Sequence, residues 1–118
     1  MDQLSALLVV KALDGLSMRA AAISQNVANS NSPSYVPVRV DYEQQLRAAS
    51  SEGADAVRGV RPEFVRMPMA EGIGGTGGEM RLDLELASAS ETALRYAALV
   101  DVLGRQMQIS RLAVTGGK

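Results

Sequence analysis

The chain has 118 residues, a formal charge of -1, and neither cysteine nor histidine. This length allows one small domain, and twelve basic against thirteen acidic residues argue against an electrostatic nucleic-acid binder. Without cysteine and histidine the chain lacks thiolate chemistry, the commonest general base and the usual zinc ligands. We therefore expect no enzyme activity, no metal and no cofactor.

Residues 3–29 are predicted to form a long N-terminal helix. They are rich in Ala, Leu, Met and Gln and contain no proline, and Gly15 is the one expected weak point. Small and apolar residues recur in steps of three and four, which places them in one stripe that needs another helix to cover it. The stripe consists of Ala6, Val9, Leu13, Leu16, Ala20, Ile23 and Val27.

Residues 30–49 are predicted to form a turn, an extended arm and a short helix. Turn-forming Asn and Ser surround Pro33, and the residues that follow alternate between apolar and polar up to Tyr42. Pro37 restricts this arm to a sheet edge or an isolated extension, and Asp41 is a candidate cap for the short helix. Tyr35 and Tyr42 either anchor the arm on a helix of this chain or of a neighbour, or form a local hydrophobic clamp.

Residues 50–79 lack periodicity and are rich in glycine, so we expect an irregular, flexible segment. Residues 72–77 match the pattern G-x-G-x-x-G, which binds dinucleotides only between a buried strand and a helix. No such strand precedes the pattern here. We interpret these glycines as part of a linker.

Residues 83–114 are predicted to form a long C-terminal helix. Its heptad stripe consists of Leu86, Ala89, Ala93, Tyr96, Val100, Leu103 and Met107. Further apolar residues, among them Leu94 and Ile109, lie off this stripe and favour more than one neighbour, unless the N-terminal helix covers a broad face. The acidic pairs Asp83 with Glu85 and Asp41 with Glu43 are interpreted as helix-start charges rather than as catalytic carboxylates.

The expected fold is therefore mainly α. Two long terminal helices form an antiparallel coiled-coil hairpin, with a short extended arm and an irregular glycine-rich middle segment between them. The whole of 1–118 is expected to be a single domain. No stretch of about eighteen apolar residues is present, so we expect no membrane span, and the N-terminus lacks the positive region of a cleaved signal peptide.

Residues 26–35, Asn-Val-Ala-Asn-Ser-Asn-Ser-Pro-Ser-Tyr, resemble the motif that closes the N-terminal helix of flagellar basal-body rod proteins. Both termini resemble this family, most closely its proximal rod members, over roughly 4–46 and 80–117. The chain departs from the usual motif at Ser32, Ser34 and Thr92. The motif residues are Asn26, Ala28, Asn29, Pro33, Tyr35, Asp41 and Tyr42.

The resemblance implies a structural subunit of the bacterial flagellar rod, which assembles through its terminal helices into a hollow tube that transmits torque and continues the export channel. It implies contacts with itself, with other rod proteins, with the inner-membrane ring and a basal-body adapter protein, and with the type III export apparatus. The implied location is the periplasmic rod, reached without a cleaved signal. The alternative is a cytoplasmic helical-hairpin adaptor or chaperone.

Overall fold

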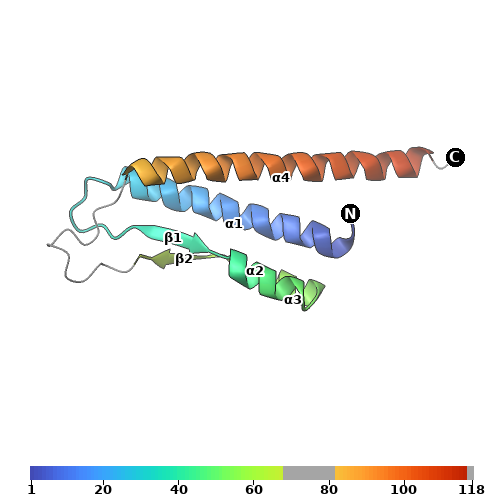
Figure 1. Cartoon of the computed structure of the whole chain (residues 1–118), viewed down its shortest axis with the longest axis horizontal. Coiled ribbons are helices and arrows are strands. Elements are labelled where there is room, and N and C mark those ends of the chain that lie inside the picture. The colour runs from blue at the N-terminus through green and yellow to red at the C-terminus, as the bar shows by residue number, and fades with distance from the viewer. Residues whose placement is uncertain (68–81, 117–118) are drawn as a thin grey trace.

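The computed structural model describes residues 1–67 and 82–116 and is mainly helical, which confirms that part of the expected fold (Figure 1). The elements in chain order are α1 (Gln3–Ala28), β1 (Val38–Asp41), α2 (Glu43–Ser50), α3 (Ala54–Arg58), β2 (Glu63–Arg66) and α4 (Leu82–Gly116). The molecule is elongated, with extents of 70 × 28 × 15 Å. The glycine pattern at 72–77 lies outside the described residues.

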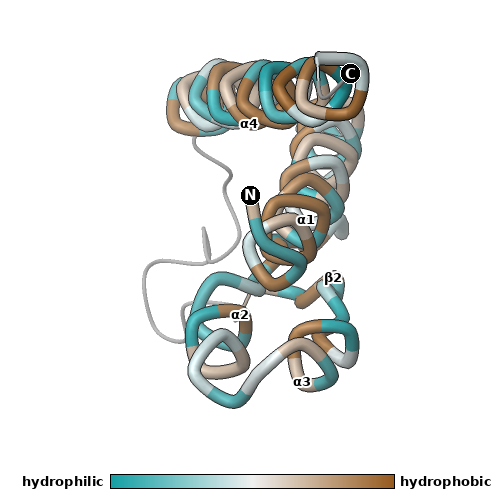
Figure 2. The backbone as a smooth tube through the Cα atoms, turned by 90° about the vertical axis from the view of Figure 1, so that its right-hand side faces the viewer, coloured by the Kyte–Doolittle hydropathy of each residue, from teal (hydrophilic) through white to brown (hydrophobic). Residues whose placement is uncertain are grey.

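Helix α1 is the middle layer of the molecule. Helix α4 runs along one side of it in the opposite direction, and the strands with α2 and α3 lie on the other side (Figures 1 and 2). The backbone N–H of Ser5 donates a 2.7 Å hydrogen bond to Asp2, which therefore caps the start of α1. At its other end, the backbone and side-chain N–H groups of Asn29 both donate to the Gln25 carbonyl.

Regular structure extends into the segment that the sequence predicted to be irregular. Strands β1 and β2 pair antiparallel, with Val38 opposite Arg66 and Asp41 opposite Glu63, and α3 lies between α2 and β2. The prediction for 50–79 is therefore wrong for α3 and β2, while 68–79 lie outside the described residues. Gly53 has φ +115°, a backbone angle that favours glycine, and this residue turns the chain from α2 into α3.

The predicted cap of the short helix is also wrong. Tyr42 occupies the N-cap position of α2, with no side-chain hydrogen bond to the helix. The carboxylate of Asp41 instead accepts a 3.0 Å hydrogen bond from Arg39. Because Asp41 belongs to β1 and pairs with Glu63, its backbone follows the strand rather than the start of the helix.

Two hydrophobic clusters hold these layers together. The first joins Leu16 and Ala22 of α1 to Val40 and Tyr42, with Leu99 of α4 packed against it. The second consists of Ala49, Val57 and Val60, and three leucines near the start of α1 pack on it: Leu4, Leu7 and Leu8. Both clusters contact α1, so its position is fixed from the strand side as well as from α4.

Candidate assembly surface

The face of α4 that contacts α1 differs from the predicted stripe by about one residue at most positions. The covered positions of α4 are Glu85, Ser88, Ala89, Thr92, Leu99, Leu103 and Gln106. This set also has heptad spacing, but it includes a glutamate, a serine, a threonine and a glutamine. The contact between α1 and α4 thus uses the more polar of two neighbouring rows.

The predicted stripe of α4 consequently faces solvent at most positions. Leu86, Ala93, Tyr96, Val100 and Met107 are exposed, and Met107 has 63% of its surface accessible. Ala89 and Leu103 are half-buried because they belong to both rows. An isolated chain would be expected to bury its most apolar row, so this arrangement leaves apolar surface available to another partner.

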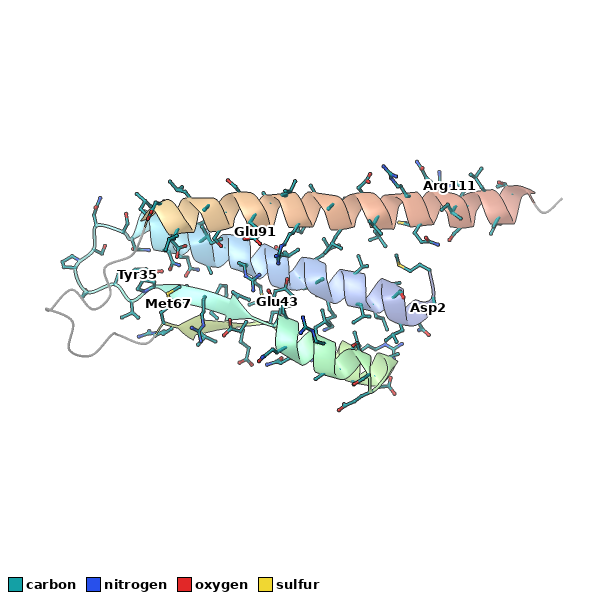
Figure 3. The ribbon with its side chains drawn as sticks, in the orientation of Figure 1. Asp2, Tyr35, Glu43, Met67, Glu91 and Arg111 are labelled. Carbon is teal, nitrogen blue, oxygen red and sulfur yellow. The ribbon has the colours of Figure 1, made fainter. Side chains whose placement is uncertain are left out.

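The outer half of α4, residues 100–116, carries further exposed apolar side chains. Ile109, Leu112 and Val114 are 58%, 68% and 80% exposed. Arg111 lies along this half, at the opposite end of the molecule from Tyr35 (Figure 3). Such a concentration of exposed aliphatic residues on one helix makes this half of α4 a candidate interaction surface.

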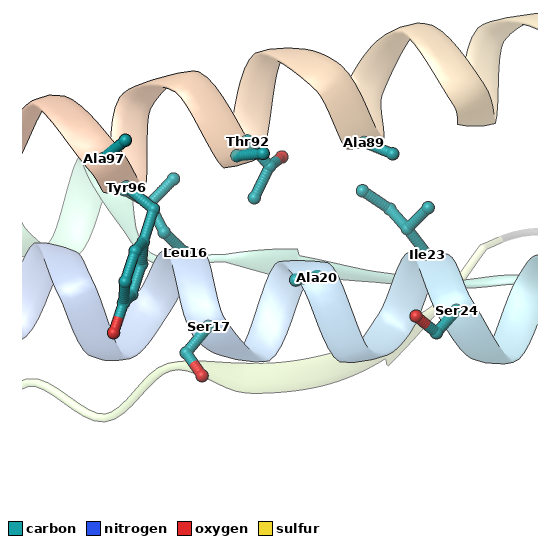
Figure 4. A pocket seen from close by; sticks show the side chains of 10 residues that line it. Leu16, Ser17, Ala20, Ile23, Ser24, Ala89, Thr92, Tyr96 and Ala97 are labelled. Carbon is teal, nitrogen blue, oxygen red and sulfur yellow. The ribbon is translucent and has the colours of Figure 1, made fainter.

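On α1 the predicted stripe is largely covered. Leu16 and Ile23 are buried, Ala6, Val9, Leu13 and Val27 are half-buried, and Ala20 is exposed. Ala20 is exposed because it lies in a groove of about 420 Å³ between α1 and α4. The residues that line this groove include Leu16, Ala20 and Ile23 of α1 and Ala89, Ala93, Tyr96 and Ala97 of α4. Figure 4 shows the groove from close by.

Asn26 connects α1, the arm and α4. Its side-chain amide donates to the Val38 carbonyl at 2.8 Å and to Glu85 of α4 at 3.2 Å. Its oxygen accepts hydrogen bonds from the Val38 backbone N–H and from the Tyr35 hydroxyl, both at 2.9 Å. The residue is 1% exposed, and these bonds satisfy the donors and acceptors of its amide.

Tyr42 packs on α1 at Gly15. A β-carbon at Gly15 would overlap the Tyr42 ring, so the glycine that the sequence marked as a weak point makes room for this contact. Arg19 lies over the same ring, 5.1 Å from its centroid, and donates to the Val40 carbonyl and to Glu43. Both tyrosines of the arm therefore contact α1 of their own chain, which was one of the alternatives left open by the sequence.

The electrostatics of this contact follow from burial and pairing. Burial raises the pKa of Tyr42, because the ionised phenolate loses its hydration. The hydrogen bond from Arg19 lowers the pKa of Glu43 and raises that of Arg19 itself. At the N-terminus, the hydrogen bond from the Ser5 backbone lowers the pKa of Asp2.

Three other motif residues lie at or near the turn after α1. Ala28 and Pro33 are exposed, whereas Asn29 is half-buried and closes the helix. Asp41 is exposed and lies at the far end of β1. The structure therefore brings Asn26, Tyr35 and the arm together at one junction and leaves Asp41 outside it.

Three of the four residues in the two predicted acidic pairs each contact a different side chain. Glu85 accepts from Asn26, Glu43 pairs with Arg19, and Asp41 pairs with Arg39. Within residues 1–67 and 82–116, no three Asp or Glu residues lie close enough to hold a metal ion. None of the helices in this described part combines the length and the hydropathy that a membrane crossing requires.

Sequence reasoning did not identify Arg19, Glu85 or Thr92 as contact residues. Thr92 is 4% exposed and lies opposite α1. Thr92 belongs to a second row of heptad spacing, one residue before Ala93 and the predicted row. That spacing could have identified Thr92 as a position that faces α1. Arg19, as the single basic residue of α1 after Lys11, was a candidate for pairing with the arm.

No protein-family model matches this chain, and no curated protein matches it.

Proposed function

We propose that the chain is a structural subunit of the bacterial flagellar basal-body rod, of the proximal FlgB type. In this proposal α1 and α4 form an antiparallel coiled-coil hairpin, and their uncovered surfaces meet neighbouring subunits in a hollow axial tube. The tube transmits torque and continues the export channel. The protein has no catalytic role and needs no cofactor.

One observation carries this proposal: most side chains of the most apolar row of α4 are exposed, while a more polar row is covered by α1. Burying Val100, Met107 and Val114 would each contribute on the order of 1–2 kcal/mol of hydrophobic free energy. That free energy is available to a subunit contact and is not used within the monomer. A subunit that gains stability when its neighbours bury this surface is favoured to assemble into a polymer.

The motif at the end of α1 supports the same proposal. The residues that carry the family resemblance, Asn26 and Tyr35, share a hydrogen bond and hold the arm on α1. The resemblance therefore coincides with a connected set of contacts rather than with scattered positions. The proposed partners are other rod proteins, the inner-membrane ring with its adapter protein, and the export apparatus through which the subunit reaches the periplasm.

Deletion of the gene tests this function. We expect cells without the chain to lack hooks and filaments and to be non-motile, and expression of the intact chain to restore swimming. Because rod subunits are needed for every later stage of assembly, partial motility is not expected. Normal swimming and normal hooks in the deletion strain would contradict the proposal.

The groove between α1 and α4 favours the adaptor alternative, because an apolar groove between two helices can also bind a helix of a partner protein. An adaptor would stay in the cytoplasm as a discrete complex. Fractionation separates the two functions: recovery of the chain with basal bodies supports the rod, and recovery in a soluble cytoplasmic complex supports the adaptor.

A further inference from the structure

The two-stranded sheet has one covered edge and one open edge. We propose that the open edge, formed by β2, pairs with β2 of a second copy of this chain in antiparallel order, centred on Val65. This contact is separate from the terminal helices and goes beyond the proposed rod function. Because it has two-fold symmetry, it points two copies in opposite directions and therefore belongs to the chain outside the axial tube.

The hydrogen-bond pattern of the sheet determines which backbone groups point outward. The Met67 N–H donates to the Pro37 carbonyl at 2.9 Å, so these two residues form a hydrogen-bonded pair. In an antiparallel ladder such pairs alternate with pairs whose N–H and C=O groups point away from each other. The backbone groups of Phe64 and Arg66 therefore point away from β1, and those of the residues opposite them on β1 point away from β2.

Helix α1 covers the outer edge of β1, which lies between α1 and β2 (Figure 1). Asn26 bonds to both the N–H and the C=O of Val38, and Arg19 donates to the Val40 carbonyl at 2.7 Å. These bonds agree with the outward direction of the groups. The edge of β2 has no such cover: in the described part of the chain, no hydrogen bond reaches its outward backbone groups. An open edge of this kind is available to another strand.

The side chains of β2 favour pairing with another strand. Phe64, the single phenylalanine of the chain, is 47% exposed, and Val65 is 36% exposed. Both residue types are enriched in paired strands. Neither proline nor a bulge, two features that block pairing at natural sheet edges, interrupts β2. The composition of β2 therefore suits a paired strand.

Charge and hydrogen bonding select one register. In antiparallel pairing about Val65, Phe64 of each copy lies opposite Arg66 of the other, and all outward backbone groups find partners. Each guanidinium then lies beside an aromatic ring, which is a favourable contact. A register centred on Arg66 would place like charges opposite each other. One centred on Phe64 would place Arg66 opposite Pro62, which has no N–H to donate. Parallel pairing in register would place Glu63 opposite Glu63.

The contact is weak and reversible. A strand of 4 residues buries less than the roughly 1,000 Å² that a stable interface needs, so the dimer forms only at high protein concentration. A covalent trap is therefore the appropriate test, and the chain has no cysteine of its own. Val65 is suitable for the trap, because it shares the exposed face of the sheet with Arg39 and Asp41.

Val65→Cys in the full chain tests the inference by disulfide exchange in a glutathione redox buffer. In the proposed register the two Val65 positions form a non-hydrogen-bonded pair, with Cα atoms about 4.5 Å apart, which allows a disulfide. Glu63→Cys is the matched control. It lies on the same face of the same strand, but its two copies would be about 14 Å apart along the strands. We expect at least about tenfold more disulfide-linked dimer from Val65→Cys.

A proline block separates edge pairing from chance collision. Phe64→Pro combined with Val65→Cys removes an outward N–H and places the proline ring where the second strand would lie. The hydrogen bonds between β1 and β2 do not use this N–H and are retained. The cross-link should fall to the level of Glu63→Cys. If this variant loses the circular dichroism of the unmodified chain, Arg66→Pro combined with Val65→Cys tests the same edge.

The outcomes decide both the contact and the occupant. Equal cross-linking in Val65→Cys and Glu63→Cys would overturn the edge contact, as would a folded proline variant that still cross-links fully. Cross-linking of Val65→Cys to a different protein in cells, with no homodimer, would overturn the choice of a second copy. The rod function is tested separately by the location of the chain in basal bodies, so it can stand or fall without this contact.

Discussion

At the scale of single residues, Asn26 explains why an amide belongs at the end of α1. Its side chain pairs with both the N–H and the C=O of Val38, as the backbone of a neighbouring strand would do. It also contacts Tyr35 and Glu85, so one buried residue joins the first helix, the arm and the last helix. No apolar residue can replace these bonds.

Asn26→Ala should therefore lower the free energy of unfolding by about 2–4 kcal/mol, because it leaves buried polar groups of Val38 without partners. Urea unfolding followed by circular dichroism measures the change. Asn29→Ala is the matched control, since it removes a solvent-exposed hydrogen bond and should cost about 0.5 kcal/mol. Equal losses in the two variants would show that Asn26 is not the connecting residue.

Gly15 and Gly104 are both helix-interior glycines, but their surroundings differ. A β-carbon at Gly15 would overlap Tyr42, whereas one at Gly104 would meet nothing within 4 Å. Gly15→Ala should lower the free energy of unfolding by roughly 1–3 kcal/mol through overpacking. Gly104→Ala should raise it by about 0.5–1 kcal/mol through helix propensity. Thermal unfolding tests the pair, and stabilisation by both substitutions would contradict the Tyr42 contact.

The ion pair between Arg19 and Glu43 makes a pH-dependent contribution. Because the pKa of Glu43 is lower in the folded state, the pair stabilises the fold above the unfolded pKa, and this is lost as the pH falls through the folded pKa. Glu43→Gln should thus cost roughly 0.5 kcal/mol at pH 7, and this difference should shrink below about pH 4. Unfolding titrations at several pH values measure it.

The control for this titration is Glu52→Gln, since Glu52 is exposed and forms no ion pair in the described part of the chain. Its effect on stability should stay small at every pH. A pH-independent loss in Glu43→Gln would mean that the carboxylate contributes through packing alone.

At the scale of elements, the sequence predicted the two long helices well because each has an uninterrupted heptad pattern and strong helix formers. It did not resolve which row of α4 faces α1, because residues 85–106 contain two adjacent rows with the same spacing. Apolarity favoured the row with Leu86 and Met107, whereas the contact uses the row with Glu85 and Thr92. In the proposed assembly the apolar row would be buried between subunits, whereas the single chain buries the more polar row.

The small elements were predicted less well. Residues 54–58 and 63–66 form α3 and β2, although neither has a periodic pattern long enough to identify it. Their order comes from tertiary contacts: Val57 and Val60 pack against leucines of α1, and β2 pairs with β1. Lys11 of α1 adds a 2.8 Å hydrogen bond to the Val60 carbonyl. Such distant partners cannot be read from local composition.

Met107→Asp tests the uncovered row of α4 without disturbing the monomer. Met107 is exposed, so the free energy of unfolding should change by about 0.5 kcal/mol or less. In an assembled contact the same aspartate would be a buried, unpaired charge, so we expect the variant to fail to restore swimming to a deletion strain. Leu103→Asp is a less selective test, since Leu103 is half-buried in the monomer.

Gln108→Asp is the matched control, because it introduces the same charge on the adjacent exposed residue of the outer half. The control should swim normally. If both variants swim as well as the unmodified chain, the uncovered row has no part in assembly.

At the scale of the whole molecule, the two long helices differ in how much of their surface is covered. Helix α1 organises the chain, since α4 lies on one side of it and the strands with α2 and α3 on the other (Figure 2). Helix α4 runs parallel to the long axis of the molecule with much of its apolar surface uncovered (Figure 1). The proposed rod subunit requires both features: a helix α1 held in place by contacts within the chain, and a long helix α4 with apolar surface left for neighbouring subunits.

The central claim is that this chain is part of the flagellar rod, and its location tests that claim most directly. A short epitope at the exposed turn of Ser51 and Glu52 lies between α2 and α3, away from the surface of α4. Basal bodies extracted with detergent from cells carrying the tagged chain should contain it, and immuno-electron microscopy should place the label at the base of the rod. Intact basal bodies without the chain, together with abundant tagged protein in the cytoplasm, would contradict the account.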